Sequence, residues 1–137
     1  MKFGLFYSHA CPRPWDDTSD QLKLKQALEQ VVFADKLGID YVWAVEHHFL
    51  EEYSHSAAPE LFLTAAAMVT NNIRLAHGIV HTIPAINHPV RVAERIATLD
   101  LLSNGRVEFG TGEGSSFAEL DGFMVNEKMK REMWEEG

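Results

Sequence analysis

The sequence has little cysteine, a deficit of basic residues and no long apolar run. Its 137 residues include one cysteine, Cys11, which has no partner for an intrachain disulfide, so a reducing compartment, the cytoplasm, is expected. Twelve lysines and arginines stand against 20 aspartates and glutamates, and this net charge of -8 argues against a nucleic-acid partner. The apolar residues 1–7 and 61–69 are too short for a signal peptide or for a membrane span of about 20 residues. We therefore expect neither secretion nor membrane insertion.

The composition that remains is that of an ordinary globular protein. Hydrophobic residues make up 46% of the chain and charged residues 23%, far from the polar, highly charged composition of disordered proteins. The length and the absence of a flexible linker predict one domain over residues 1–137.

Short β-like runs alternate with helical patterns along the chain. The runs begin near residues 3, 39, 73 and 106, and helical patterns follow over 20–37, from Pro59, over 89–102 and over 126–136. Gly38 is placed to end the first helix, and Pro59 and Pro89 to open the next two. A repeat of about 31 residues is that of a barrel of about 250 residues divided into eight units. The predicted class is α/β, the first half of a (β/α)8 TIM barrel with four βα units and parallel strands; a complete doubly wound sheet is the alternative.

Helical spacing also predicts which side chains face the core. The inward positions of the four helical segments are, in order, Leu24, Leu28, Val31 and Ala34; Leu61, Phe62, Ala65, Ala66 and Val69; Val92, Ala93, Ile96, Leu99 and Leu102; and Met129 with Met133.

Polar residues follow each predicted strand. Ser8-His9, Glu46-His47-His48, His81-Thr82 and the segment 111–116 come directly after the four runs. Because ligands of parallel α/β folds bind at the carboxyl ends of the strands, these residues are the candidate site.

The Glu46-His47-His48 triplet combines a carboxylate with two imidazoles, which suits proton transfer or metal binding. Adjacent strand residues face opposite ways, so we expect one histidine to serve the site and the other the structure. No metal site is predicted, since the triplet lacks a same-face ligand pair and His77 and His81 lie about 13 Å apart on an extended strand.

The segment Gly110-Thr111-Gly112-Glu113-Gly114-Ser115-Ser116 predicts a glycine-rich turn after the fourth strand. Its backbone N–H groups suit an anion or a flat ring, so Thr111 and Gly112 are candidate cofactor-binding residues; a plain tight turn is the alternative. No neighbouring motif activates Cys11, so an inert thiol is expected.

Four segments in this order resemble the bacterial luciferase-like flavin monooxygenases. They are residues 1–6, the segment 38–49 with its Glu-His-His triplet, the run 88–94, and residues 99–110.

The resemblance implies a barrel that binds reduced FMN at the carboxyl ends of its strands. The family forms a flavin C4a-hydroperoxide with O2 and oxygenates a small organic substrate, while a separate NAD(P)H:flavin reductase supplies the reduced flavin. By the same resemblance His47 is the catalytic, proton-handling residue and Glu46 lies beside the ring. Gly78 and Ile79 match strand-three residues that pack against the isoalloxazine, often across a non-prolyl cis peptide.

Two positions depart from the luciferases proper. Gly112 stands where they have a reactive cysteine, and Glu113 where they have a phosphate-binding arginine. These differences argue against light emission, and leave phosphate binding to the backbone amides of Gly114 and Ser115 or to the other half of the barrel. Deazaflavin F420 is a minor alternative cofactor.

Two other functional classes remain open. A half-barrel has unpaired sheet edges, so the chain is expected to form a dimer or other homo-oligomer, and a non-catalytic fragment or interaction subunit is the alternative to an enzyme. A metal-dependent hydrolase barrel could use the same histidines, and copurifying zinc or flavin would separate these two.

Overall fold

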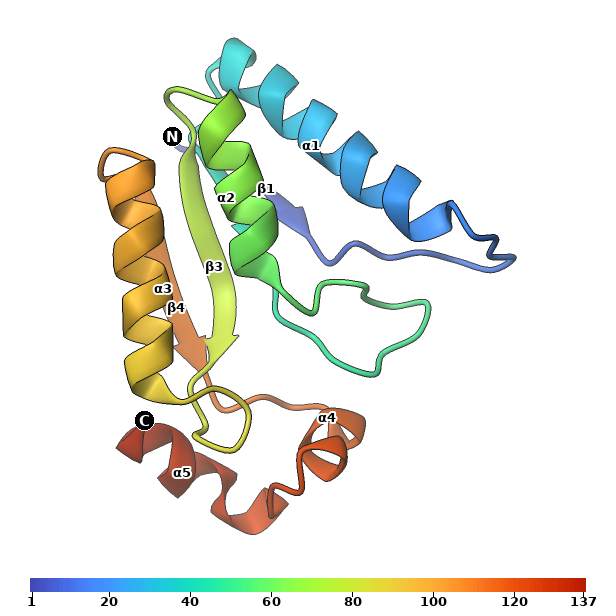
Figure 1. Ribbon diagram of the computed structural model, residues 1–137, viewed down its shortest axis with the longest axis vertical. Helices are drawn as coiled ribbons and strands as arrows, with labels where there is room; N and C mark the ends of the chain where they lie inside the picture. The colour runs from blue at the N-terminus through green and yellow to red at the C-terminus, as the bar shows by residue number, and fades with distance from the viewer.

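The structure, a computed structural model, describes residues 1–137 and consists of alternating strands and helices (Figure 1). In chain order the elements are β1 (Gly4–Tyr7), α1 (Ser19–Leu37), β2 (Tyr41–Ala44), α2 (Pro59–Val69), β3 (Arg74–His81), α3 (Pro89–Leu102), β4 (Val107–Gly112), α4 (Phe117–Gly122), the 3-10 turn η1 (Glu127–Met129) and α5 (Lys130–Glu136).

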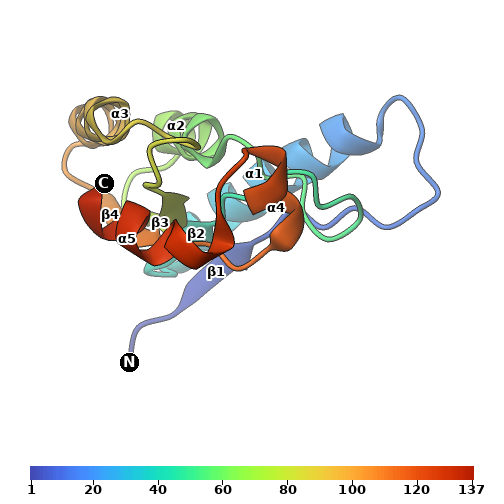
Figure 2. The same ribbon diagram turned by 90° about the horizontal axis from the view of Figure 1, so that it is seen from below.

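The four strands form one parallel sheet in the order β1-β2-β3-β4. Helices α1, α2 and α3 lie along one face of this sheet, and α4 and α5 lie beyond the carboxyl ends of β3 and β4 (Figures 1 and 2). Four sequential βα units in a parallel sheet are the predicted first half of a (β/α)8 barrel, and the fold class is confirmed.

The predicted helix boundaries are confirmed where glycine and proline mark them. Gly38 ends α1 with a φ of 80°, a left-handed conformation that glycine adopts without steric cost. Pro59 and Pro89 are the first residues of α2 and α3, where a missing N–H costs no helical hydrogen bond.

The fourth strand is longer than predicted, because the glycine-rich segment continues the sheet. Thr111 pairs with Val80 and Gly112 with His81, after a register shift in β3. The turn therefore begins after Gly112 rather than at Gly110.

The carboxyl-terminal part also differs from the prediction. The expected helix over 126–136 is divided into η1 and α5, and the short helix α4 precedes it. Met133 packs on a small core of Ile83, Leu120 and Val125, whereas Met129 is exposed.

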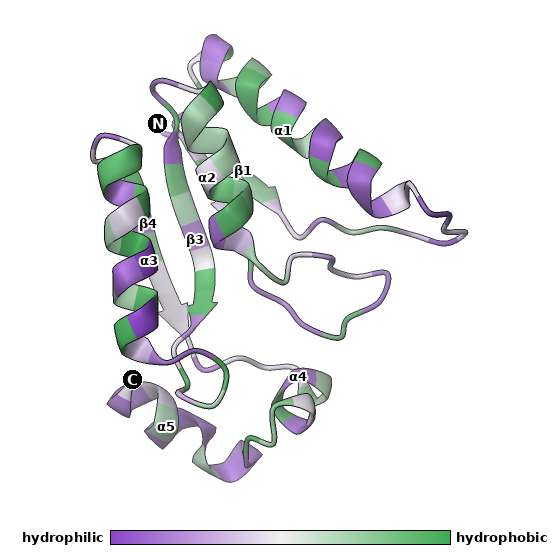
Figure 3. Ribbon diagram, viewed as in Figure 1, coloured by the Kyte–Doolittle hydropathy of each residue, from purple (hydrophilic) through white to green (hydrophobic).

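The main core lies between the sheet and the three helices. Val31, Ala34, Phe62, Ala66 and Leu99 are buried there as predicted, and Figure 3 shows α2 as largely hydrophobic. Other positions predicted to face inward are exposed, because each helix contacts the sheet along a narrow stripe and four strands leave its flanks uncovered: Leu24, Leu61, Ala65, Val69, Ala93 and Leu102. Three of these, Leu24, Leu61 and Ala65, line a cavity of about 450 Å³ between α1 and α2.

The helices are also too short or too polar for a bilayer: none meets the length and apolarity that a membrane crossing requires.

Asp35, a buried acid near the end of α1, ties that helix to the start of β3. Its carboxylate accepts backbone N–H groups from Asn71, Asn72 and Ile73 at 2.7–2.9 Å. Burial alone would raise the pKa of Asp35, but these three hydrogen bonds hold it below its ordinary value. The acid is thus a fixed part of the fold.

We expect Asp35→Ala to lower the free energy of unfolding by about 2–4 kcal/mol, since it leaves buried N–H groups without an acceptor. Urea unfolding followed by circular dichroism measures the change. The exposed Asp17→Ala is the control and is expected to be neutral. Equal stability of the two variants would show that solvent replaces the carboxylate.

Candidate active site

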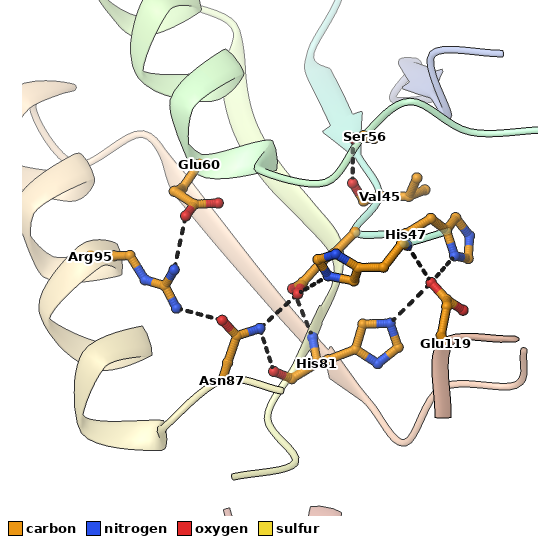
Figure 4. A network of polar contacts seen from close by, with 10 residues as sticks. Val45, His47, Ser56, Glu60, His81, Asn87, Arg95 and Glu119 are labelled. Carbon is orange, nitrogen blue, oxygen red and sulfur yellow. Dashed lines mark hydrogen bonds and ion pairs between the residues drawn. The ribbon is translucent and has the colours of Figure 1, made fainter. Parts of the chain in front are cut away.

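A network of polar side chains occupies the carboxyl ends of β2 and β3 (Figure 4). Its members come from the segment after β2, the end of β3, the loop before α3, and α4. The strand ends converge here because parallel strands present their carboxyl ends at one edge.

His47 is held by a buried carboxylate from α4. Its Nδ1 lies 2.9 Å from Oε1 of Glu119, and the same oxygen accepts the backbone N–H of His48 at 2.8 Å. The side chain of Glu119 is 1% exposed and that of His47 is 23% exposed. A carboxylate facing Nδ1 favours a proton on that nitrogen, which leaves Nε2 of the neutral ring as an acceptor.

Glu46 is enclosed by donors. Its carboxylate contacts Nε2 of His48 at 2.9 Å and accepts the side-chain N–H of Asn87 at 2.6 Å and the backbone N–H of His81 at 3.1 Å. Burial alone would raise the pKa of Glu46, yet these hydrogen bonds keep it below the ordinary value. Glu46 is therefore a carboxylate that organises the network.

The network continues outward to α2 and α3. Arg95 donates to Oδ1 of Asn87 at 2.8 Å and to Oε1 of Glu60 at 2.9 Å (Figure 4). Asn87 is thereby oriented to donate to Glu46.

That one of His47 and His48 serves the site and the other the structure stays a prediction, although the reason given for it changes. β2 ends at Ala44, so the alternation of strand side chains no longer applies to the triplet. His47 contacts Glu119 and His48 contacts Glu46, and both rings belong to one network.

His81 and His77 lie in different surroundings, although both are on β3. The ring of His81 lies beside the network, with Nε2 3.9 Å from Oε1 of Glu119, and neither of its ring nitrogens has a hydrogen-bond partner. His77 faces a small cavity that Glu60 and Arg95 also line. Burial lowers the pKa of both histidines, which favours the neutral ring.

Ligand atoms of His47, His81 and Glu119 lie within 4.8 Å of one another. Two imidazoles and one carboxylate form a donor set that zinc accepts. The carboxylate oxygen nearest both rings accepts the backbone N–H of His48 and faces Nδ1 of His47.

On the face of β2 and β3 away from the helices (Figure 2), Gly78 lies against two aromatic rings. A Cβ at Gly78 would lie 3.1 Å from the ring of Trp43 and 3.7 Å from that of Phe6, and the Phe6 side chain is mostly exposed. The peptide between Gly78 and Ile79 is cis, as the family resemblance implies. These residues form an aromatic, backbone-floored surface.

Thr111 and Gly112 lie on opposite sides of β4. Gly112 packs against Ile79, where a Cβ would lie 3.1 Å from its side chain. The hydroxyl of Thr111 instead accepts Nε1–H of Trp134 at 3.2 Å, on the side of α5. Of these two predicted cofactor residues, only Gly112 adjoins the surface at Gly78.

The turn after β4 is contacted by the ammonium group of Lys130. Gly114, with a φ of 72°, lies against the ring of His81, and its carbonyl oxygen accepts Nζ–H of Lys130 at 2.9 Å. Oε2 of Glu113 is buried without a partner.

The family model for luciferase-like monooxygenases matches residues 1–136 of the chain. The chain belongs to the luciferase-like monooxygenase family. Among similar proteins, limonene 1,2-monooxygenase from Rhodococcus erythropolis is 40% identical over 116 residues, which are 83% of this chain and 28% of that protein.

Solved structures of this luciferase-like family show the same fold. Monooxygenase RslO1 from Streptomyces bottropensis superposes with a TM-score of 0.87 at 32% identity, over 99% of this chain and 40% of that one. The oxygenating constituent of 3,6-diketocamphane monooxygenase from Pseudomonas putida, in complex with FMN, superposes with a TM-score of 0.85 at 27% identity. The match covers 99% of this chain and 37% of that one. The chain thus spans about a third of the length of its relatives.

Relatives of this luciferase-like chain differ in cofactor. The diketocamphane enzyme is an FMN complex. The F420-dependent glucose-6-phosphate dehydrogenase of Amycolatopsis mediterranei is 31% identical over 106 residues, which are 75% of this chain and 31% of that protein.

Sequence reasoning missed four members of the network: Glu60, Asn87, Arg95 and Glu119. Glu119 lies 72 residues from His47, and Asn87 lies 41 residues from Glu46. Glu119 sits in a helix that periodicity did not reveal, so its only signal was an acid between apolar residues near a glycine-rich turn.

Proposed function

We propose that this chain carries the flavin side of an FMN-dependent monooxygenase that oxygenates a small organic substrate with O2. A separate NAD(P)H:flavin reductase supplies reduced FMN. The observation that carries the proposal is the placement of His47: it follows β2, the strand whose Trp43 lines the surface at Gly78, and a buried carboxylate holds it.

The residues present fit the isoalloxazine ring. A surface formed by Gly78, Trp43 and Phe6 suits a flat aromatic group, and a side chain at Gly78 would displace the ring of Trp43. Ile79 and Gly112 extend this surface. For the phosphate, the backbone N–H groups of Gly114 and Ser115 are the candidate donors.

Reduced FMN, when bound, supplies the electrons with which O2 is activated. In this proposal His47 holds and moves a proton at Nε2, since Nδ1 faces Glu119. The carboxylate of Glu119 keeps the ring oriented. Glu46 fixes the adjacent His48, so the triplet is positioned from both sides.

F420 is the second candidate cofactor, because similar proteins carry that dependence in their names. It shares the tricyclic ring shape with FMN, and the surface at Gly78 accepts either. A parallel titration with both cofactors decides between them.

We expect saturable binding of FMN by the chain, measured by fluorescence titration with oxidised and reduced flavin. Gly78→Ala is expected to weaken binding about tenfold, or about 1.4 kcal/mol, because its methyl group displaces the Trp43 ring that lines the surface. Gly38→Ala is the matched control: it is strained but lies in open space, so it reports the effect of lost stability alone.

Size-exclusion chromatography alongside the titration identifies the species that binds, with a dimer proposed. If the chain binds F420 but not FMN, F420 takes the place of FMN as the proposed cofactor. Failure to bind either would favour a non-catalytic role for this chain.

A further inference from the structure

A second cluster of metal-ligating side chains lies apart from the His47 network. Ligand atoms of Cys11, Asp20 and His55 all lie within 4.8 Å of one another. They come from the loop after β1, the first turn of α1 and the loop between β2 and α2. We propose that these three residues bind a Zn²⁺ ion, independently of the flavin chemistry.

The loops hold each donor in place. The backbone N–H of Cys11 donates to the carbonyl of Glu52 at 3.0 Å, and its carbonyl accepts Nε1–H of Trp15 at 2.6 Å. The ring of Trp15 packs edge-on against that of His55, with centroids 5.5 Å apart. Nδ1 of His55 contacts a carboxylate oxygen of Asp20. The donors are thus gathered by the fold, although 44 residues of sequence separate Cys11 from His55.

Buried nitrogens at this place lack partners. Nε2 of His55 is buried with no hydrogen-bond partner. His9, only 3% exposed, has no partner at either ring nitrogen, and it lines the 450 Å³ cavity together with His55. A buried nitrogen without a partner requires an explanation, and for Nε2 of His55 a bound ion supplies one. His9 packs its ring on Tyr7 and Phe62 and is not one of the three ligands.

Donor chemistry favours a zinc-like ion. Arg13 pairs with Glu51 and Glu52, which leaves Asp20 as the acid that faces His55. A thiolate, an imidazole and a carboxylate suit Zn²⁺, whereas Mg²⁺ and Ca²⁺ prefer oxygen donors alone. Three protein ligands also leave one tetrahedral position for water or another ligand. A bound ion would tie the loop after β1 to the loop after β2.

The test is titration of the reduced chain with Co²⁺, followed by absorption spectroscopy. Because the chain has one cysteine, a thiolate-to-cobalt charge-transfer band identifies Cys11 as a ligand. We expect the band to saturate at one equivalent and Zn²⁺ to abolish it. Cys11→Ser is expected to remove it, and His47→Ala, which alters only the other cluster, is expected to leave it unchanged.

Asp20→Asn is the second variant, chosen because the Asp20 side chain is 70% exposed and its change should not disturb folding. Its metal affinity is expected to fall at least tenfold, since even outer-shell substitutions cost about 10–100-fold. Absence of the charge-transfer band overturns the proposal. So does cobalt binding that survives Cys11→Ser, above all if His47→Ala then abolishes it.

Discussion

Turnover with reduced FMN and O2 is expected to fall about 10²–10⁴-fold when His47 is replaced by alanine. The loss follows if His47 moves a proton at Nε2 while Glu119 holds Nδ1. Affinity for FMN should change little, because the surface at Gly78 stays intact. Product formation under single-turnover conditions, together with a flavin titration, separates these two effects.

His88→Ala is the control for this variant, since His88 is exposed and lies outside the network. Glu119→Gln keeps the size of the side chain but removes its charge, so an intermediate loss of turnover is expected. Turnover that survives in His47→Ala would remove His47 from the mechanism. A parallel loss of FMN affinity would make it a binding residue instead.

Stability is expected to fall steeply as the pH drops below about 6.5. His9, His77 and His81 are at most 3% exposed, none of their ring nitrogens has a partner, and burial lowers the pKa of each from its ordinary value of 6.5. Below pH 6.5 the unfolded chain takes up protons that the folded chain does not. The free energy of unfolding therefore has its full value above about pH 6.5 and falls as the pH drops toward the lowered pKa values of the folded chain. Each group contributes up to about 1.4 kcal/mol per pH unit, and the three together about 4.

Urea unfolding at several pH values between 5 and 7.5 measures this slope. His77→Gln removes one titrating ring, so the slope is expected to fall by up to about 1.4 kcal/mol per pH unit. Gln21→Ala, an exposed change that removes no titrating group, is the control and should leave the slope unchanged. A slope that is flat over this range in the unaltered chain would show that the buried rings are protonated or hydrated.

Much of the fold could be predicted because its signals are local. Apolar spacing, Gly38, Pro59 and Pro89 placed the first three helices, and the four strands lie where the β-like runs were expected. The predictions failed where tertiary contacts decide. Leu24 and Leu61 have helical spacing but line an open cavity between α1 and α2, so they stay exposed. Thr111 and Gly112 continue β4 because β3 pairs with them.

The sequence by itself determined the order of the βα units. It also determined that Glu46, His47 and His81 lie at the same edge of the sheet, because parallel strands have their carboxyl ends at one edge. Only the tertiary structure decided what each side chain contacts. Glu119 meets His47 across 72 residues, and His55 meets Asp20 across 35. Periodicity describes which face of an element is apolar, whereas polar pairing depends on how loops bring distant residues together, which no local pattern encodes.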